Sequence, residues 1–255
     1  MLSCEALTIR FGGLAAVDSI DFKVSAGEIR GLIGPNGSGK TTLFNLISGI
    51  YKPTSGNILF EGKSIAGCRP DQVTQAGIAR TFQNIRLFGD MTVWENLQVG
   101  RHCRMKQSVF ADMLSTGAKR SEETAAAIRL EELLQLFKMD SLRHELARNL
   151  PYGLQRELEI MLAMASNPRL LLLDEPAAGM NPQETAQLML QIQRLRDSGL
   201  TVLVVEHDMR LVMNICDRIT VLNYGKKIAE GLPREIQEHP EVIGAYLGKQ
   251  VKHGA

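Results

Sequence analysis

The chain has 255 residues, of which 44% are hydrophobic and 22% are charged, which is ordinary for a globular protein that buries a sizeable core. Its formal net charge of +1 provides no overall field that would draw it to nucleic acid or to anionic lipid. The longest apolar run, residues 160–165, is far shorter than the roughly 20 residues that a membrane-spanning helix needs.

The first residues, MLSCEALTIRFGG, contain no apolar stretch long enough for a signal peptide. We therefore expect any membrane role to depend on a partner protein. The cysteines include no CxxC pair, which argues against a zinc site and against a disulfide framework. We expect reduced and mostly buried thiols in a cytosolic protein. They are Cys4, Cys68, Cys103 and Cys216.

Short β-rich pieces open the chain, and the turns between them predict antiparallel strands. These pieces are residues 4–10, 20–24 and 57–60. A further predicted strand, residues 29–33, runs into a glycine-rich turn and then into a helix at about residues 40–48. This strand–turn–helix order is typical of an α/β fold.

The middle of the chain, residues 92–166, is predicted to be helical. Ser121 is followed by two glutamates, a pattern typical of a helix start. A second helix is predicted at residues 153–165, and Asn167-Pro168 ends it. We interpret this section as a helical subdomain inserted into the α/β core.

Two short apolar strands, residues 170–173 and 201–205, follow the helical section. Wholly apolar strands are expected where a parallel sheet is covered on both faces. The sequence therefore predicts an α/β fold with a largely parallel sheet, an antiparallel β subdomain and the inserted helical subdomain. The expected parts are an α/β core at residues 1–91 and 167–248, the helical subdomain at residues 92–166, and a flexible tail at residues 249–255.

The segment GPNGSGKTT matches the phosphate-binding pattern G-x-x-x-x-G-K-[ST] in full. Glycines let backbone N–H groups turn toward phosphate oxygens, and the following helix directs its positive end at the same place. Lys40 is expected to reach the β- and γ-phosphates of ATP, and the Thr41 hydroxyl to bind Mg²⁺. An ordinary glycine-rich turn would need neither residue. The predicted ATP-binding residues are Gly34, Pro35, Asn36, Gly37, Ser38, Gly39, Lys40, Thr41 and Thr42.

Two acidic residues follow the strand at residues 170–173. Asp174 is placed to hold the Mg²⁺ shell and Glu175 to polarise an attacking water. The alternative is a solvated turn or a helix cap, which acidic residues before a proline often form. His207 ends the next strand, at the same edge of the sheet, and we expect it to sense the γ-phosphate, although a lone histidine is usually a surface or core residue.

Together these motifs resemble the ATP-binding subunits of ABC transporters, and the resemblance covers almost the whole chain. It implies that Gln83 lies in the Q-loop, which contacts the metal and the nucleophilic water and links to the membrane subunit. Residues 177–181, AAGMN, resemble the D-loop, and His207 resembles the switch histidine. Phe11 stands where the family has an aromatic residue that stacks on adenine, although a phenylalanine alone is equally well explained as part of the core.

Longer segments are similar to the ATPases of the branched-chain amino acid transporter subgroup. They are FNLISGIYKPTSGNILFEGKSI, ARTFQNIRLFGDMTVWENL, DEPAAGMNPQET and GLPREIQEHPEVIGAYLG. Residues 100–120 resemble the longer insert of one of the subgroup's two ATPases. Relatives that act on urea, other amides or lipopolysaccharide share many of these motifs, so related cargoes, other amino acids among them, remain open.

The signature motif departs from the family pattern LSGGQ, which is commonly LSYGQQ in this subgroup. The segment here is LPYGLQ, in which Pro151 replaces the serine and Leu154 replaces a glutamine. In the family this loop closes on the γ-phosphate bound to the opposite subunit, and proline supplies neither a hydroxyl nor an N–H. We therefore hypothesise that the two ATP sites of the assembly differ in activity.

The resemblance implies a P-loop ABC-type ATPase that uses ATP and Mg²⁺ and drives uptake of branched-chain amino acids through two separate transmembrane permease subunits. It also implies a sister ATPase or a second copy of this chain, an external solute-binding protein as an indirect partner, and no nucleic acid. The expected location is the cytoplasmic face of the inner membrane. The implied catalytic residues are Glu175, His207 and Gln83, and the implied metal ligands are Thr41, Gln83 and Asp174.

Two other functions stay open. A soluble ABC ATPase acting on ribosomes or DNA would usually carry two fused ATPase domains or a long coiled-coil insertion, whereas this chain has one set of motifs and no sustained heptads. A small-molecule kinase would share the phosphate-binding loop. It would also need a substrate pocket and a lid, and would not explain Gln83, His207 and the AAGMN segment together.

Overall fold

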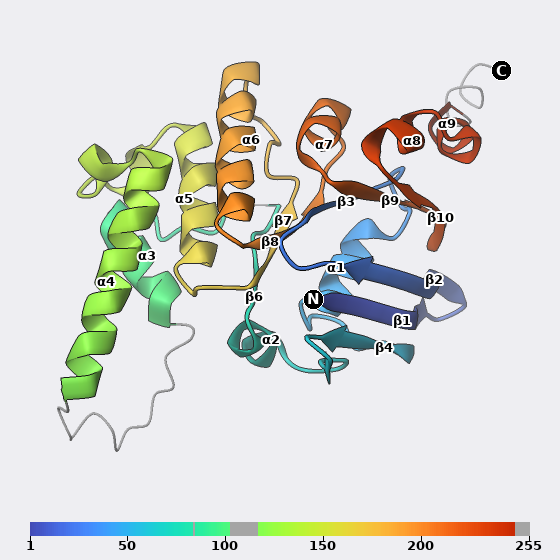
Figure 1. Cartoon of the computed structure of the whole chain (residues 1–255), viewed down its shortest axis with the longest axis horizontal. Helices are drawn as coiled ribbons and strands as arrows, with labels where there is room; N and C mark the ends of the chain where they lie inside the picture. The colour runs from blue at the N-terminus through green and yellow to red at the C-terminus, as the bar shows by residue number, and fades with distance from the viewer. Residues whose placement is uncertain (84, 103–116, 248–255) are drawn as a thin grey trace. The chain divides into compact units, whose positions relative to one another are not determined.

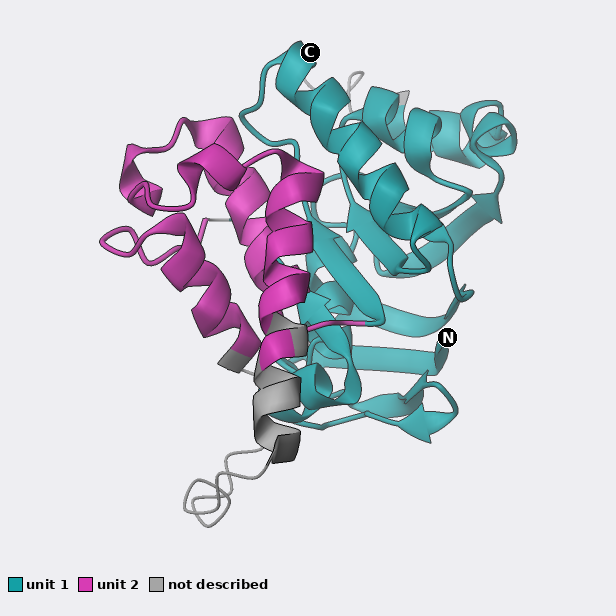
Figure 2. Cartoon of the chain, turned by 60° about the vertical axis from the view of Figure 1, so that its left-hand side comes forward, with its two compact units in different colours: residues 1–83, 169–255 teal, residues 84–168 magenta. Residues whose placement is uncertain are grey.

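The computed structural model describes residues 1–83, 85–102 and 117–247 (Figure 1). The predicted flexible tail at residues 249–255 and most of the insert at residues 100–120 lie outside them. The chain forms two compact units, which Figure 2 shows in teal and magenta: unit 1 is Met1–Gln83 with Arg169–Ala255, and unit 2 is Asn84–Pro168. The division at residues 92 and 166 stays our proposal for the domains.

Unit 1 contains two β-sheets. The first is antiparallel, with the order β2-β1-β4-β5, and its strands are β1 (Leu2–Phe11), β2 (Leu14–Val24), β4 (Ser55–Phe60) and β5 (Lys63–Ser64). The second has the order β10-β9-β3-β8-β7-β6 and is parallel except for β10. Its strands are β3 (Ile29–Ile33), β6 (Ile78–Arg80), β7 (Leu170–Asp174), β8 (Thr201–Val205), β9 (Arg218–Asn223) and β10 (Lys226–Gly231). The predicted mixture of a parallel and an antiparallel sheet is confirmed.

Helices connect these strands and cover the parallel sheet. The helices of unit 1 are α1 (Lys40–Ile47), α2 (Pro70–Ala76), α6 (Pro182–Asp197), α7 (Met209–Ile215), α8 (Pro233–Gln237) and α9 (Pro240–Leu247). The helix predicted after the glycine-rich turn is confirmed as α1, within one residue of its expected end.

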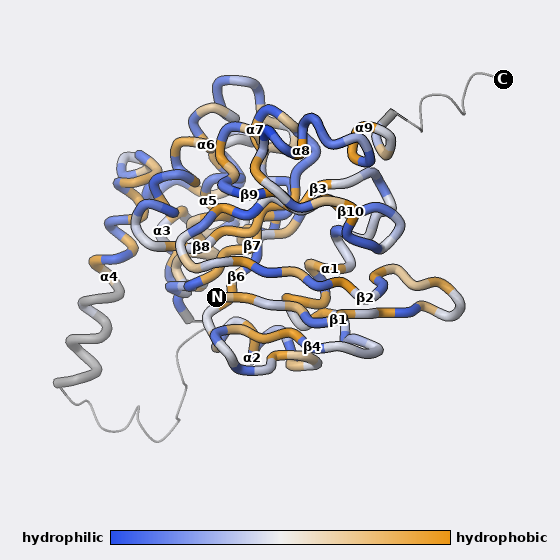
Figure 3. The backbone as a smooth tube through the Cα atoms, turned by 45° about the vertical axis from the view of Figure 1, so that its right-hand side comes forward, coloured by the Kyte–Doolittle hydropathy of each residue, from blue (hydrophilic) through white to orange (hydrophobic). Residues whose placement is uncertain are grey.

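Both faces of the parallel sheet are buried. Leu170 and Leu172 of β7 join a hydrophobic cluster that includes Phe44 of α1. On the other face, a Cβ atom added at Gly31 of β3 would lie 3.3 Å from a methyl group of Val212, so α7 packs there. Residues 170–173 of β7 and 202–205 of β8 are accordingly all hydrophobic (Figure 3). This confirms the prediction made from their apolar sequences.

The register of the parallel sheet brings the ends of four strands to one edge. Asp174 at the end of β7 lies opposite Val205 at the end of β8, and the ends of β3 and β6 lie on the same side. Because loops at the carboxyl ends of parallel strands share that edge, segments far apart in the sequence meet there.

Unit 2 is helical. Its helices are α3 (Val93–His102), α4 (Gly117–Phe137) and α5 (Tyr152–Met164), and two short 3₁₀ turns lie at Asp140–Leu142 and Ala147–Asn149. Helix α3 packs closely on α5, since a Cβ atom at Gly100 would lie 2.4 Å from the Leu162 carbonyl oxygen. The predicted helix start at Ser121 is wrong, because α4 begins at Gly117. Ala118, Lys119 and Arg120 are good helix formers, which extends the helix upstream.

The described cysteines are free thiols. Cys4 and Cys216 are buried and Cys68 is half-buried, whereas Cys103 lies outside the described part of the chain. Burial raises the pKa of the Cys4 thiol to about 12. No helix among the described residues is both long enough and apolar enough to cross a bilayer.

Candidate nucleotide site

The phosphate-binding loop forms the turn between β3 and α1. Gly34 has φ = +151°, and a Cβ atom there would lie 2.1 Å from the Leu222 carbonyl oxygen. Gly39 has φ = +104°, and its Cβ atom would lie 2.6 Å from the Ala16 carbonyl oxygen. Both positions therefore require glycine, for conformational and for steric reasons.

Lys40 begins α1, and its ammonium group turns back into the loop. Its Nζ donates to the carbonyl oxygens of Gly34 at 2.7 Å and Pro35 at 3.1 Å. The Ser38 hydroxyl is buried in the same loop and has no hydrogen-bond partner within the described residues. A largely buried positive charge and an unpartnered hydroxyl are groups that an anionic ligand rich in oxygen would satisfy.

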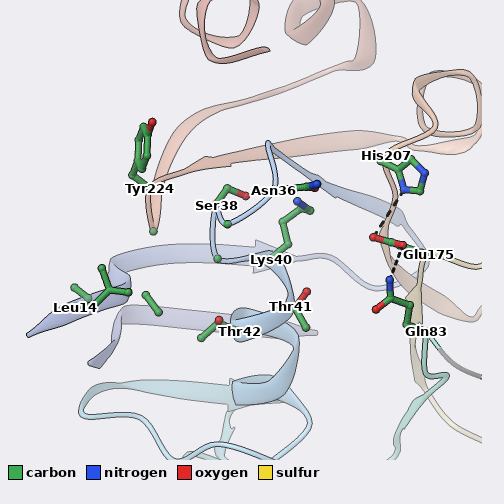
Figure 4. Close-up of a pocket in the computed structure, with 15 residues that line it drawn as sticks. Leu14, Asn36, Ser38, Lys40, Thr41, Thr42, Gln83, Glu175, His207 and Tyr224 are labelled. Atoms are coloured by element: carbon green, nitrogen blue, oxygen red, sulfur yellow. Dashed lines mark hydrogen bonds and ion pairs between the residues drawn. The ribbon is translucent and has the colours of Figure 1, made fainter. Parts of the chain in front are cut away.

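Three side chains from neighbouring strand ends meet beside this loop (Figure 4). Gln83 follows β6, Glu175 follows β7, and His207 follows β8. Gln83 Nε2 donates to Glu175 Oε2 at 3.1 Å, and His207 Nδ1 lies 3.8 Å from Glu175 Oε1. Glu175 has φ = +49°, a left-handed conformation that costs on the order of 1–3 kcal/mol for a residue other than glycine. Such strain persists only where the surroundings hold the residue.

The loop and these side chains line one cavity of about 740 Å³ in unit 1. That volume falls in the range of small-molecule sites. The cavity brings together most of the residues that the sequence predicted, namely Asn36, Gly37, Ser38, Gly39, Lys40, Thr41, Thr42, Gln83, Glu175 and His207. Gly34 and Pro35 do not line it, but both hold Lys40 through their carbonyl oxygens.

Asp174 does not line the cavity either, and lies buried at the end of β7. Its Oδ2 accepts a hydrogen bond from Arg80 Nη2 at 2.7 Å. Arg80 Nη1 also donates to Asn45 Oδ1 at 2.7 Å and to Ser48 Oγ at 2.9 Å. Arg80 therefore joins β7 to α1 and to the strand that leads to Gln83. The sequence did not predict this role, because nothing local distinguishes Arg80 from other arginines.

Oxygen atoms that could bind a divalent cation occur in α1, after β6 and at the end of β7. They are the Thr41 hydroxyl, the Gln83 side-chain carbonyl and the Asp174 carboxylate. Mg²⁺ prefers such hard oxygen ligands, and in nucleotide sites it takes one or two carboxylates together with phosphate oxygens and waters. In the part of the chain that the structure describes, no three His, Cys, Asp or Glu side chains are grouped so that they could hold a metal. Thr41 and Gln83 line the cavity and fit Mg²⁺ that binds together with a nucleotide, whereas Asp174 bonds to Arg80 outside the lining and its part in the metal site stays a prediction.

The other end of the cavity carries apolar and aromatic side chains. Leu14 and Tyr224 line it, on the side away from the ends of β7 and β8 (Figure 4). Phe11 is 48% exposed and is not a lining residue, and its ring meets that of Tyr51 edge-on with centroids 5.4 Å apart. Its adenine-stacking role stays a prediction. Tyr224, in the turn between β9 and β10, is a second aromatic candidate that sequence reasoning missed.

The signature segment lies in unit 2, where α5 begins. Pro151 is the N-cap residue of α5, with φ = −52° and no side-chain cap hydrogen bond. Its carbonyl oxygen accepts the Gln155 N–H at 3.0 Å, and Gln155 Nε2 donates to the Leu150 carbonyl oxygen at 2.8 Å. Proline thus fits the backbone of this helix start, because its ring holds φ near the value found here, but it leaves the position without a hydroxyl.

Asn181 ends the predicted D-loop and caps α6. Its Oδ1 accepts the N–H groups of Gln183 at 2.9 Å and Glu184 at 3.0 Å. Glu184 Oε2 accepts the Asn181 N–H in return at 2.8 Å, which completes a capping box. Asn181 therefore has a structural role of its own.

Comparisons with known families give two matches. The family described as "ABC transporter" matches residues 17–178, which contain the phosphate-binding loop, Gln83 and Glu175. A second family, described as "Branched-chain amino acid ATP-binding cassette transporter", matches residues 226–252, which contain β10, α8 and α9.

Individual relatives match over nearly the full length. The chain is 45% identical over 250 residues to the high-affinity branched-chain amino acid transport ATP-binding protein LivG of Escherichia coli K12, covering 98% of each protein. It is 44% identical, with the same coverage, to the corresponding protein BraF of Pseudomonas aeruginosa. Among solved structures, the ADP conformation of MJ1267, an ATP-binding cassette of an ABC transporter, has a TM-score of 0.85 at 30% identity and covers 97% of this chain and 98% of its own.

Proposed function

The chain belongs to the ABC transporter family of ATP-binding proteins, which are ATPases coupled to transport, and we propose that it powers an importer of branched-chain amino acids. The observation that carries the proposal is the cavity in which Lys40, Glu175 and His207 meet. The cargo assignment is supported by the similarity to LivG and BraF and by the match of the C-terminal segment.

ATP would bind with its phosphates on the loop between β3 and α1. Backbone N–H groups of the loop and the N-terminal end of α1 provide positive partial charge for the phosphate oxygens. Lys40 would exchange its bonds to loop carbonyls for bonds to the β- and γ-phosphates. The ribose and base would then extend toward Leu14 and Tyr224, because the opposite end of the cavity is occupied by the hydrolytic groups.

Mg²⁺ would be held by Thr41, Gln83 and Asp174 and would neutralise charge on the phosphates. Glu175 would accept a hydrogen bond from the attacking water and hold it in line with the γ-phosphate. Gln83, already bonded to Glu175, would fix the orientation of that carboxylate. His207 would contact the γ-phosphate, so this contact would form with ATP and be lost after hydrolysis to ADP.

The chain would act with protein partners. These are two transmembrane permeases, a sister ATPase or a second copy of this chain, and indirectly an external solute-binding protein. The ATPase would be a peripheral protein on the cytoplasmic face of the inner membrane. ATP bound between two cassettes would favour their closed arrangement and hydrolysis would release it, so the nucleotide would bias a two-state change in the permeases.

The altered signature segment leads to a prediction about the assembled transporter. With a sister ATPase that has an intact signature as the partner, the site that Pro151 completes should be the weaker of the two, because proline offers no hydroxyl to the γ-phosphate bound to the partner. Combining Pro151→Ser with Leu154→Gln is expected to raise ATP turnover of the complex up to about two-fold, since a second set of donors would then stabilise a transition state. Phosphate release by the purified complex measures this, and unchanged turnover would count against unequal sites.

The proposed function is tested by identifying what copurifies with the full chain from its own cells. Glu175→Gln protein serves as bait in the presence of ATP, because a site that binds but does not hydrolyse ATP should hold the closed assembly together. We expect two multi-span membrane proteins and an ATPase, and slower leucine uptake in cells that carry only this variant. Ribosomal or DNA-repair proteins without a membrane subunit would refute the transport function. Uptake of urea or amides, but not of leucine, would refute the cargo.

A further inference from the structure

A buried carboxylate outside the cavity connects the turns that carry Glu175 and His207. Glu206 directly follows β8, is only 1% exposed and does not line the cavity. Burying an ionised side chain is costly unless hydrogen bonds replace its hydration. The partners of Glu206 therefore indicate its role.

Each oxygen of Glu206 bonds to a different turn. Oε1 accepts the N–H of Ala177 at 2.9 Å, in the turn that follows β7 two residues beyond Glu175. Oε2 accepts the N–H groups of His207 at 3.0 Å and Asp208 at 3.3 Å, where the chain leads from β8 into α7. One side chain thus spans two turns that are distant in the sequence.

The turns after β7 and β8 begin side by side, but the hydrogen bonds of the sheet end with the strands and cannot hold the turns together. Asp174 pairs with Val205 in the sheet, and the Glu175 N–H donates to the Val205 carbonyl oxygen at 2.9 Å. Past this point, Glu206 links the turns, and His207 Nδ1 lies 3.9 Å from its Oε2. The left-handed backbone of Glu175 is the kind of conformation that such surrounding bonds must maintain.

The arrangement requires a carboxylate and not merely a polar side chain of the same shape. Three N–H donors point at Glu206, and an ionised carboxylate offers acceptors only. A carboxamide would turn one oxygen into a donor, which would face a backbone N–H. Burial raises the pKa of the Glu206 carboxyl, and its bonds to the backbone N–H groups of Ala177, Asp208 and His207 oppose that shift.

We propose that Glu206 is a positioning residue for ATP hydrolysis, which sets the distance between Glu175 and His207 by holding one turn with each carboxylate oxygen. The inference rests on the proposed ATPase function, which it deepens. Glu206 is buried outside the lining of the cavity, so it acts through Glu175. Because a misplacement of about 1 Å can reduce a rate on the order of 10²-fold, loosening these turns should affect turnover far more than binding.

The test compares Glu206→Gln with wild type in the assembled complex. We expect kcat to fall about 10- to 100-fold, while KM for ATP and equilibrium ATP binding change less than about two-fold. In a Glu175→Gln background the second substitution should have no further effect on residual turnover, since the group that Glu206 positions is already absent. Hydrogen exchange at the amides of Ala177 and Asp208 should become faster.

Glu28→Gln is the control for loss of a buried carboxylate, because Glu28 accepts the Ser25 N–H at 2.8 Å and also pairs with Arg30, whose Nε lies 3.1 Å from the same oxygen. It precedes β3 at the end opposite the phosphate-binding loop, so it should change stability without changing kcat. Should Glu206→Gln fail to fold, Glu206→Asp replaces it, because the shorter side chain keeps the charge but cannot span both turns. The inference is overturned if kcat stays at the wild-type value, or falls equally in the Glu175→Gln background. Absence of ATP hydrolysis by the wild-type complex would instead refute the proposed function.

Discussion

Glu175→Gln is expected to reduce kcat for ATP hydrolysis by about 10²- to 10⁴-fold while ATP binding stays close to wild type. The substitution keeps the shape of the side chain and allows a hydrogen bond with Gln83, which now joins Nε2 to Glu175 Oε2 at 3.1 Å. It removes the negative charge that would orient and polarise water. The phosphate-binding loop and Lys40 are untouched, so affinity for ATP should be retained.

Phosphate release by the assembled complex gives kcat, and equilibrium binding of ATP gives the affinity. Glu184→Gln is the matched control, because Glu184 lies in the first turn of α6 and serves the Asn181 capping box, where glutamine is also accepted. A kcat within about ten-fold of wild type for Glu175→Gln would show that another group orients the water, since general-base catalysis contributes more than that. Loss of ATP binding would show that Glu175 belongs to the binding site and not to the hydrolytic step.

The site residues whose role follows from their neighbours in the sequence could be predicted. The nine consecutive residues 34–42 contain all the groups that the loop needs to bind phosphate, so the sequence alone identifies this loop. Glu175 and His207 could be predicted because each lies within two residues of the end of an apolar strand, and parallel strands present their carboxyl ends at one edge. Six strands could be predicted because their sequences are apolar or lie between turns, whereas β5, β6, β9 and β10 were not predicted.

The residues that hold the site together could not be predicted, because their partners are fixed by the register of separate strands. Arg80 bonds to Asp174, which is 94 residues away in the sequence, and Glu206 bonds to Ala177, which is 29 residues away. No pattern in the sequence indicates the partner of either residue. Tyr224 was missed for a related reason, since only folding brings the β9–β10 turn to the cavity.

The Arg80–Asp174 pair has consequences for stability because both side chains are nearly inaccessible to water. They are 8% and 7% exposed, and Nη2 of Arg80 lies 2.7 Å from Oδ2 of Asp174. The guanidinium also lies 5.5 Å from the ring centroid of Phe44 and 5.3 Å from that of Phe82. Removing one partner of a buried pair leaves an uncompensated charge, and this penalty exceeds the value of the attraction itself.

Arg80→Met should therefore lower the free energy of unfolding of the nucleotide-free chain by about 3–5 kcal/mol, as expected when a buried ion pair loses one member. Methionine has a similar length and keeps contact with the aromatic rings, so the loss reports mainly the stranded Asp174 carboxylate and the unsatisfied acceptors on α1. Denaturant unfolding measures the change.

Arg69→Met is the control, because its pair with Asp71 is exposed and should contribute nothing measurable. Adding Asp174→Asn to Arg80→Met should recover part of the lost stability, since a neutral amide is cheaper to bury than an unpaired carboxylate. If the double variant were less stable than Arg80→Met alone, the stranded charge would not be the cause. The contacts of Arg80 with Asn45 and Ser48 would then account for its effect on stability.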